Sequence, residues 1–236
     1  MEHLNKNHDA AAPWFFYAQK EASMKYIIMC GGQYDWKTPR QLTEIFGEPV
    51  VARTIRLLRQ EGVEDIAISA TDPRFARFGV PMISHENDFQ VENGEVIRGS
   101  WVNAFFPTDE PTCYIFGDVV FSQDGIRKIV ATETSGILFF GSTPPFSPMF
   151  IKKYAEPFAF KVADQPRFRG AIDFVNANLK TGIFRRHPIA WELWQVICGR
   201  DVREIDYDSV TAINDFTCDI DYPADAKRIE AVLCAL

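Results

Sequence analysis

Apolar and polar residues alternate along the chain in blocks that are typical of an α/β protein. Val51, Ile55 and Leu58 recur at helical spacing, which predicts a helix that ends at Gly62. Shorter apolar runs have the length and composition of buried strands, and they are residues 26–30, 65–69, 81–84, 112–116 and 136–140. This alternation predicts a largely parallel sheet that is covered by helices on both faces.

The first apolar run ends at Cys30 and leads into a pair of glycines, Gly31 and Gly32. Two cations, Lys37 and Arg40, follow the glycines. Glycine lacks a Cβ atom, so a phosphate group can approach the backbone N–H groups closely. The nearby cations can neutralise the bound phosphates. The segment therefore predicts a polyphosphate cradle at the carboxyl end of the first strand, although a Gly-Gly pair is also typical of an ordinary turn.

Three blocks after the glycines carry a family resemblance. Residues 39–42 are Pro-Arg-Gln-Leu, residues 47–50 are Gly-Glu-Pro-Val, and residues 62–66 are Gly-Val-Glu-Asp-Ile. In this order, after a strand and a glycine loop, they resemble the opening of the nucleotidyltransferase superfamily with the GT-A-like fold. The resemblance implies a three-layer α/β/α Rossmann-like fold with a mixed, mainly parallel central sheet.

The chain departs from the family pattern in the glycine loop. The family's Gly-x-Gly-x-Arg loop lacks its second glycine and its arginine here, and Lys37 is the cation that we expect to replace that arginine. Arg40 stands where the family has a lysine, which keeps the charge but changes the donor geometry. The resemblance implies that Cys30, Gly31 and Gly32 bind the nucleotide, with Lys37 and Arg40 as catalytic cations.

Two further blocks resemble the segments with which the family binds a divalent cation. Residues 114–122, Tyr-Ile-Phe-Gly-Asp-Val-Val-Phe-Ser, resemble its strand that ends in Gly-Asp-Val, which implies that Asp118 is a metal ligand. Residues 218–226, Cys-Asp-Ile-Asp-Tyr-Pro-Ala-Asp-Ala, resemble the closing block of cytidylyltransferase-like and molybdopterin-guanylyltransferase-like members, which implies that Asp221 is the second ligand. Mg²⁺ suits such a site because one or two carboxylates and substrate phosphates commonly hold it.

These aspartates have alternative interpretations. Asp219 is so close to Asp221 in the sequence that either residue fits the second metal position. Aspartate is also favoured in turns and at helix N-termini. An alternative is therefore that Asp118 caps a turn, and that Asp221 and Asp225 cap the last helix.

A middle segment resembles, more loosely, the family loop and helix that hold the nucleobase. It comprises residues 94–104, Gly-Glu-Val-Ile-Arg-Gly-Ser-Trp-Val-Asn-Ala. The resemblance implies that Arg98, Gly99 and Ser100 contact the edge of the base. The alternative is a plain turn at residues 93–94 and a helix N-cap at Ser100.

The family varies in the region that corresponds to residues 142–200 to hold its acceptor. Residues 158–162, Phe-Ala-Phe-Lys-Val, resemble the strand that brings a lysine toward the acceptor or the α-phosphate, which implies that Lys161 is catalytic. Residues 191–197, Trp-Glu-Leu-Trp-Gln-Val-Ile, predict a buried helix face, with an acceptor pocket or a homodimer contact as alternatives. Arginine is mostly a surface residue, but four arginines are candidates for contact with an acceptor anion. They are Arg167, Arg169, Arg185 and Arg186.

Composition narrows the class of protein. A chain of 236 residues with 47% hydrophobic content can form one large domain, which we expect at residues 24–236, after an N-terminal extension at residues 1–23. The net charge of −7 argues against a nucleic-acid or membrane-surface partner. The five cysteines are scattered without a Cys-x-x-Cys pair, which favours a reducing cytoplasm over a disulfide framework or a zinc site. No run of about 18 apolar residues predicts a membrane span.

Together these features predict a cytoplasmic, Mg²⁺-dependent nucleotidyltransferase. It would transfer a nucleoside monophosphate from an NTP to a phosphorylated small molecule and release pyrophosphate. The closing block favours CTP as the donor, and the resemblance implies a sugar phosphate, alcohol phosphate or phosphonate as the acceptor, for surface polysaccharide or head-group synthesis. Three alternatives remain open. A molybdopterin-guanylyltransferase-like enzyme fits the closing block, although its loop normally keeps the Gly-Gly/Gly-x-Arg character that this chain lacks. A GT-A glycosyltransferase should carry Asp-x-Asp where this chain has Gly-Asp-Val-Val, and a non-catalytic nucleotide-sugar-binding protein would tolerate the altered glycine loop.

Overall fold

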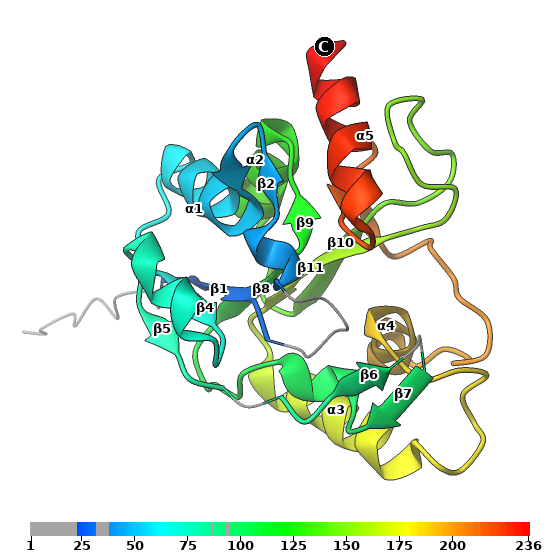
Figure 1. Cartoon of the computed structure of the whole chain (residues 1–236). Helices are drawn as coiled ribbons and strands as arrows, with labels where there is room; N and C mark the ends of the chain where they lie inside the picture. The colour runs from blue at the N-terminus through cyan, green and yellow to red at the C-terminus, as the bar shows by residue number, and fades with distance from the viewer. Residues whose placement is uncertain (1–22, 32–37, 86, 93–94) are drawn as a thin grey trace, which may run out of the picture.

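The computed structural model describes residues 23–31, 38–85, 87–92 and 95–236 (Figure 1). Two of the predicted cradle residues, Gly32 and Lys37, lie outside the described residues. The same holds for the predicted N-terminal extension, except for its last residue.

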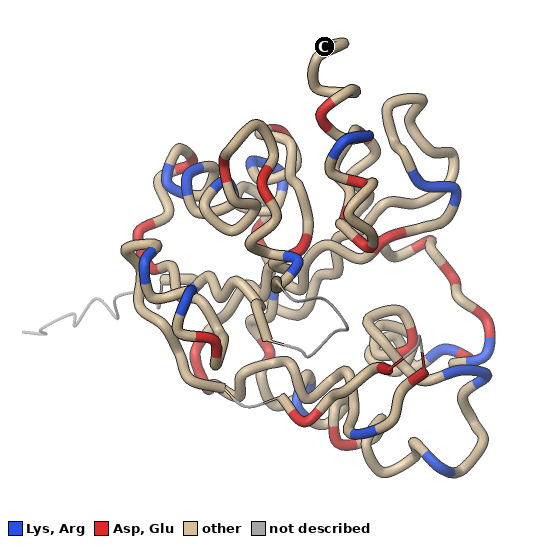
Figure 2. The backbone as a smooth tube through the Cα atoms, in the orientation of Figure 1, with Lys and Arg blue, Asp and Glu red and all other residues tan. Residues whose placement is uncertain are grey.

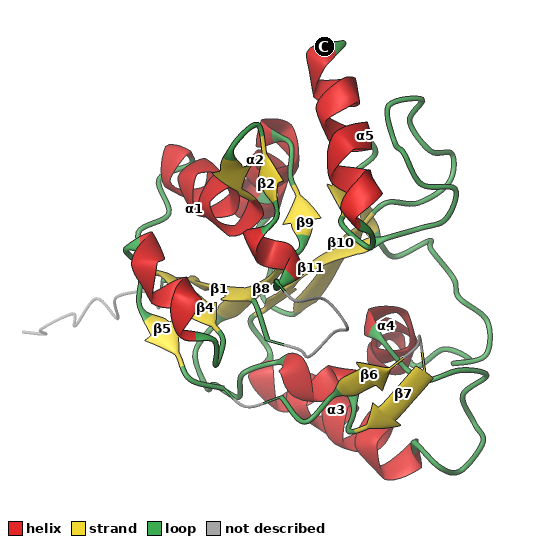
Figure 3. Ribbon diagram, in the orientation of Figure 1, coloured by secondary structure: helices red, strands yellow, loops and turns green. Residues whose placement is uncertain are grey.

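A seven-stranded mixed sheet forms the centre of the protein (Figure 3). In spatial order its strands are β12 (Thr211–Ala212), β10 (Ile137–Gly141), β11 (Pro157–Val162), β8 (Thr112–Phe116), β1 (Lys25–Met29), β4 (Ile66–Ser69) and β5 (Met82–Ile83). Only β11 runs against its neighbours in this sheet, and the other pairs are parallel. The predicted mixed, mainly parallel sheet is therefore confirmed.

Helices cover both faces of the sheet. The helices α1 and α2 lie on one face, and α3 and α4 lie on the other, which gives three layers (Figures 1 and 3). The α-helices are α1 (Val50–Gln60), α2 (Gln123–Ala131), α3 (Gln165–Asn178), α4 (Ala190–Cys198) and α5 (Pro223–Cys234). Short 3₁₀ helices are η1 (Arg40–Leu42), η2 (Pro73–Phe78) and η3 (Trp101–Ala104). Among the described residues, no helix has the length and apolarity that crossing a bilayer requires.

The core explains why these segments form the elements that they do. The strands β1 and β8 are buried on both faces, so they consist of nearly continuous apolar residues such as Ile27 and Ile28, which are both fully buried. On the side of α3 and α4, aromatic rings fill the space between the sheet and the helices. The ring centroids of Phe139 and Phe160 are 4.4 Å apart, and that of Trp191 lies 5.0 Å from Phe139. This packing supports the interpretation of the 191–197 segment as a buried helix face.

Three small two-stranded ladders complete the fold. They are β2 (Glu44–Ile45) with β3 (Glu48–Pro49), β6 (Gln90–Glu92) with β7 (Glu95–Arg98), and β9 (Val119–Val120) with β13 (Cys218–Asp219). The last ladder matters most for function, because it joins the segment after β8 to the segment before α5.

Candidate active site

The end of β8 is fixed against the end of β1 by a glycine. The backbone N–H of Gly117 donates to the carbonyl of Met29 at 3.1 Å, and a Cβ atom on Gly117 would lie only 2.5 Å from that carbonyl oxygen. Only glycine, which has no Cβ atom, allows these two backbone segments to approach this closely. Asp118 is therefore held beside the carboxyl end of β1, where ligands of parallel sheets bind.

The ladder between β9 and β13 brings the C-terminal aspartates to the same place. Asp219 pairs with Val119 in antiparallel register, and the backbone N–H of Ile220 donates to the carbonyl of Asp118 at 2.9 Å. Side chains alternate along an extended segment, and Ile220 is fully buried. Asp219 and Asp221 both line the pocket described next.

A pocket of about 290 Å³ opens at this edge of the sheet. Four residues that the sequence predicts for the site line it, namely Gly31, Arg40, Asp118 and Asp221, and so does the alternative ligand Asp219. The other lining residues are Met29, Gln41, Asn87, Phe89, Trp101, Ala104, Phe116, Tyr154, Glu156, Pro157 and Ile189. The pocket thus combines an acidic end with an apolar, aromatic wall, which is the usual composition of a small-molecule site.

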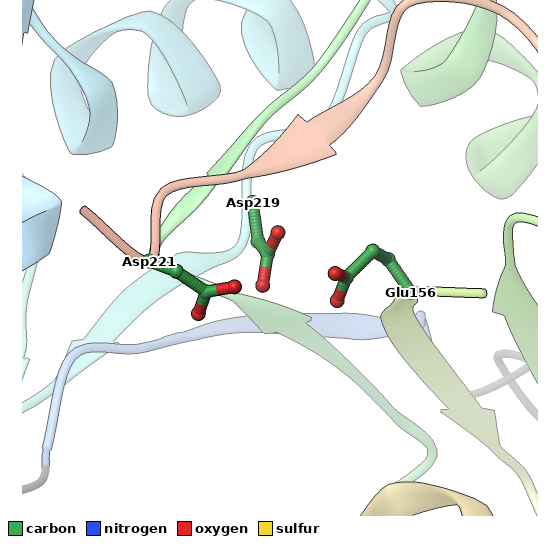
Figure 4. A group of neighbouring side chains, drawn as sticks. All are labelled: Glu156, Asp219 and Asp221. Atoms are coloured by element: carbon green, nitrogen blue, oxygen red, sulfur yellow. The ribbon is translucent and has the colours of Figure 1, made fainter. Parts of the chain in front are cut away.

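Carboxylates converge at the acidic end. Oxygen atoms of Glu156, Asp219 and Asp221 lie within 4.8 Å of one another, and Figure 4 shows the three side chains pointing toward a common point. Burial, and then the Asp219 carboxylate, raise the pKa of Asp118 to about 7, although Arg40 opposes this shift. Burial is also the main cause that raises the pKa of Glu156 and of Asp219. The cluster therefore gathers negative charge that a cation would stabilise.

Two cations contact this cluster from different elements. Nη1 of Arg40, in η1, lies 3.1 Å from Oδ1 of Asp221 and 3.9 Å from Oδ2 of Asp118. Nζ of Lys152, in the loop before β11, lies 2.6 Å from Oδ2 of Asp221 and 3.1 Å from Oδ1 of Asp219. Figure 2 shows acidic segments at the base of α5 between basic segments of η1 and of this loop.

The sequence did not predict Lys152 or Glu156 as site residues. Both lie in the predicted acceptor region, in a loop without a regular hydrophobic period. The sequence offers one weak signal for this pair, because Lys152 and Glu156 have the spacing of neighbours on a helix. The segment is not a helix, so that spacing does not explain their contact. Their role emerges only when the loop meets the C-terminal block in three dimensions.

The residues present fit a divalent cation of the magnesium type. Mg²⁺ prefers hard oxygen ligands, and this end of the pocket supplies the carboxylates of Asp118, Glu156, Asp219 and Asp221. Oε1 of Glu156 is buried and has no hydrogen-bond partner among the described residues. A buried polar atom without a partner is costly, and coordination of a cation would satisfy it.

Asp118 lies in the turn between β8 and β9, and at the last helix the capping alternative applies to Asp225. The carboxylate of Asp225 accepts from the backbone N–H groups of Asp221 and Tyr222, each at 3.0 Å, and Asp225 is almost fully buried. It therefore stabilises the start of α5, for which Tyr222 is the N-cap residue. The carboxylate of Asp221 instead contacts Arg40 and Lys152.

Lys161 lies away from the pocket and contacts the end of a helix. Its Nζ donates to the carbonyls of Ile129, Val130 and Thr132, at 3.0, 2.9 and 2.8 Å, and so satisfies the carboxyl end of α2. Because β11 is antiparallel, Lys161 pairs with Cys113 in the first half of β8, away from the pocket. Lys161 therefore does not line the pocket, which meets β11 at its other end, at Pro157, and its predicted catalytic role stays a prediction.

The predicted base-binding residues do not line the pocket either. Arg98 is exposed at the end of β7. Gly99 has a φ of +73°, and a Cβ atom there would lie 2.4 Å from the backbone oxygen of Asp88. Ser100 is buried directly before η3, and it is the next residue, Trp101, that reaches the pocket. Ser100 occupies the N-cap position of η3, as the alternative expects, although its hydroxyl makes no capping hydrogen bond, and the turn expected at residues 93–94 lies outside the described residues.

The remaining candidates also lie apart from the pocket lining. Cys30 is buried at the end of β1, where burial and then Asp118 raise the pKa of its thiol. Three of the four candidate arginines bind elsewhere: Arg167 donates to the carbonyl of Ile197, Arg169 pairs with Asp109, and Arg186 pairs with Glu192. Arg185 is exposed.

Comparisons with known proteins agree with the fold. Neither a model of a known protein family nor a curated protein matches this sequence. Among solved structures, the chain is similar to a protein from Bacillus anthracis that is assigned as a glucose-1-phosphate thymidylyltransferase and was crystallised with sucrose. The TM-score is 0.56 at 16% sequence identity, over 91% of this chain and 96% of that chain. The chain therefore has the three-layer α/β fold of that nucleotidyltransferase-type structure.

Proposed function

We propose that the protein is a Mg²⁺-dependent nucleotidyltransferase that joins the nucleoside monophosphate of an NTP to a sugar phosphate and releases pyrophosphate. The observation that carries the proposal is the convergence of Asp118, Asp219 and Asp221 with Arg40 at the carboxyl ends of β1 and β8. The fold supports it, because the similar solved structure bears the name of an enzyme that transfers a nucleotidyl group to glucose 1-phosphate.

The pocket has a part for each portion of the substrates. Gly31 ends the described part of the predicted phosphate cradle, and Arg40 lines the same pocket beside Asp118 and Asp221. The apolar wall of Phe89, Trp101 and Phe116 suits a flat base or the apolar face of a sugar ring, and it excludes water. We keep CTP as the proposed donor, on the resemblance of the closing block alone.

The reaction needs no protein nucleophile. An oxygen of the acceptor phosphate attacks the α-phosphorus in line, the bond from this phosphorus to the oxygen bridging to the β-phosphate breaks, and pyrophosphate leaves with the electron pair. Arg40 offsets the negative charge that grows on the leaving group, and the carboxylates fix the orientation of the triphosphate. When bound, Mg²⁺ supplies charge neutralisation and a template for the phosphates. Catalysis is then mainly positioning and electrostatic stabilisation.

Pyrophosphate release tests this proposal directly. We expect release only when an NTP, a sugar 1-phosphate and Mg²⁺ are all present, with CTP giving the highest rate in a panel that includes ATP, GTP, UTP and dTTP. A preference for dTTP would correct the donor but leave the reaction class intact. Transfer of a sugar from a nucleotide sugar would favour the glycosyltransferase alternative. Tight nucleotide binding with no turnover on any acceptor would favour a binding protein.

We further propose that the product, a nucleotide-activated sugar, is consumed by glycosyl transfer. The nucleoside diphosphate that the product carries on its sugar carbon is a good leaving group when an acceptor oxygen attacks that carbon, so such products are donors for polysaccharide or head-group assembly. Identification of the accepted sugar phosphate would test this, because a common metabolic sugar and a rare surface sugar imply different consumers.

A further inference from the structure

Lys152 occupies an unusual position for a lysine, because its ammonium lies among four carboxylates. Its Nζ is 2.6 Å from Asp221, 3.1 Å from Asp219, 3.4 Å from Asp225 and 3.9 Å from Glu156. Its side chain is only 6% exposed. Lysine is rarely buried to this extent unless it is paired, so these carboxylates are the reason why the ammonium is stable there.

The ammonium in turn stabilises the carboxylates. Glu156, Asp219 and Asp221 would repel one another if all three were ionised with no cation nearby. A lysine ammonium has three donors and can contact several oxygens at once. Lys152 therefore holds together a group of carboxylates that would otherwise spread apart or bind protons. We refer to Glu156, Asp219 and Asp221 as the carboxylate cage.

The cage is also the part of the site whose ligands suit a divalent cation. The three residues whose oxygens lie within 4.8 Å of one another are the same three that surround Nζ of Lys152, together with the capping residue Asp225. Mg²⁺ binds carboxylate oxygens at about 2.0 to 2.1 Å. A second positive charge at the same oxygens would be strongly repelled at such short range. The ammonium and the metal thus compete for the same atoms.

Lys152 lies in an irregular loop, next to exposed residues. It joins β10 to β11 and contains no regular secondary structure between Gly141 and Pro157. Tyr154, two residues later, is 54% exposed, and its hydroxyl lies 3.3 Å from Oδ2 of Asp221. The buried loop residues Phe150 and Glu156 hold the backbone in place, so the ammonium would leave by rotation about the bonds of its own flexible side chain.

We propose that Lys152 and a divalent cation are alternative occupants of the carboxylate cage, so that Lys152 holds the cage in the metal-free protein and leaves it when the metal binds. The inference rests on the proposed function only for the identity of the metal. Lys152 then competes with the metal for the same carboxylates. It keeps the carboxylate cage ordered when no metal is bound, and it lowers the affinity of the cage for free metal.

Metal binding without nucleotide tests the competition. Mn²⁺ serves as the probe, titrated by electron paramagnetic resonance into the full-length protein, the variant Lys152→Met and the control Lys153→Met. Lys153 is the exposed neighbour, so its change removes the same charge outside the cage. We expect Lys152→Met to bind Mn²⁺ at least about tenfold more tightly, within the range usual for two coupled ligands, and Lys153→Met to bind it like the unmodified protein. Equal or weaker binding by a folded Lys152→Met would overturn the proposal.

A second measurement uses the unmodified protein, so it does not depend on the folding of a variant. Amine acetylation followed by mass spectrometry reports the reactivity of each lysine. We expect Lys152 to react slowly without metal and several times faster with saturating Mn²⁺, while Lys153 reacts at the same rate in both. An unchanged rate for Lys152 would overturn the proposal.

The two outcomes separate this inference from the proposed function. Metal-dependent pyrophosphate release with no change at Lys152 would reject the competition and keep the nucleotidyltransferase. A metal-dependent change at Lys152 with no turnover on any nucleotide would keep the competition and reject the nucleotidyltransferase.

Discussion

Two buried lysines, near opposite ends of β11, show that burial alone does not indicate function. Lys152 and Lys161 are both nearly inaccessible to solvent. Around Lys152, burial alone would lower the pKa, but Asp219 and Asp221 raise it. Around Lys161, burial dominates and the pKa is lowered. Lys152 faces carboxylates that can exchange it for another cation, whereas Lys161 faces backbone carbonyls that belong to a helix end.

The difference follows from the direction of β11. This strand begins at the pocket, directly after Glu156, and runs toward the opposite edge, where Lys161 meets the end of α2. A parallel strand in the same place would have brought its last residues to the pocket instead. The comparison predicts that changes at the pocket edge alter kinetics and that changes at the far edge alter stability.

The largest kinetic effect is expected for Asp118→Asn. The substitution keeps the volume of the side chain and removes its charge from the proposed metal site. We expect turnover to fall by about 10² to 10³, as for the loss of a key electrostatic group. Steady-state pyrophosphate release measures the loss, and circular dichroism checks the fold. Near-native turnover in a folded variant would reject Asp118 as a metal ligand.

A paired comparison of Asp219→Asn and Asp221→Asn decides which residue serves beside Asp118. Both carboxylates belong to the cage, so we expect both variants to lose Mn²⁺ affinity and turnover. A loss confined to Asp219→Asn would show that the block at residues 218–226 is aligned two positions away from the family pattern.

A smaller kinetic effect is expected for Arg40→Ala. Arg40 contacts Asp221 directly and lines the pocket, so the change removes both a charge for the leaving pyrophosphate and a constraint on the carboxylate. A hydrogen bond to a charged group contributes about 1.5 to 3 kcal/mol. We expect a higher KM for the NTP and a lower kcat, with little change in the KM of the acceptor. A change confined to the KM of the acceptor would indicate that Arg40 binds the acceptor and not the NTP.

At the far edge of the sheet, Lys161→Met should change stability and leave kinetics intact. The variant leaves the carbonyls of Ile129, Val130 and Thr132 without their donor, which costs about 1 to 3 kcal/mol. Thermal and denaturant unfolding measure the loss, with Lys153→Met as an exposed control. A kinetic defect at a temperature where the variant is fully folded would restore Lys161 to the acceptor site.

Much of the fold was predictable because its signals are local. Apolar runs marked β1, β4, β8 and β10, and the helical spacing of Val51, Ile55 and Leu58 marked α1. The predicted cradle residue Gly31 and the predicted metal ligands Asp118 and Asp221 follow strands that end at the pocket edge, so a linear motif suffices to bring them together. This is why Gly31, Asp118 and Asp221 meet in one pocket.

The rest of the site depends on contacts that leave no local pattern. The sequence does not encode the direction of β11 in its apolar run, because a strand has the same pattern in both directions. Lys152 meets Asp219 and Asp221 only through the path of an irregular loop. The resemblance of residues 158–162 to a lysine-bearing strand therefore pointed to Lys161, although the lysine that contacts the carboxylates of the pocket is Lys152.

The smallest effect is expected for Arg169→Ala, because Arg169 lies at the far edge of the sheet, apart from the pocket lining. Nη1 of Arg169 lies 2.6 Å from Oδ1 of Asp109, whose side chain is 91% exposed, and it also donates to the carbonyl of Thr108. Exposed ion pairs contribute about 0 to 1 kcal/mol, because water screens the charges and both side chains lose freedom.

We expect unfolding curves and both substrate KM values to match the unmodified protein within error. A raised KM for the sugar phosphate would contradict the placement, because it would require Arg169 to reach an anion from outside the pocket lining. The same assay on Arg40→Ala, in which the NTP KM should change, shows that a change of this kind would be detected.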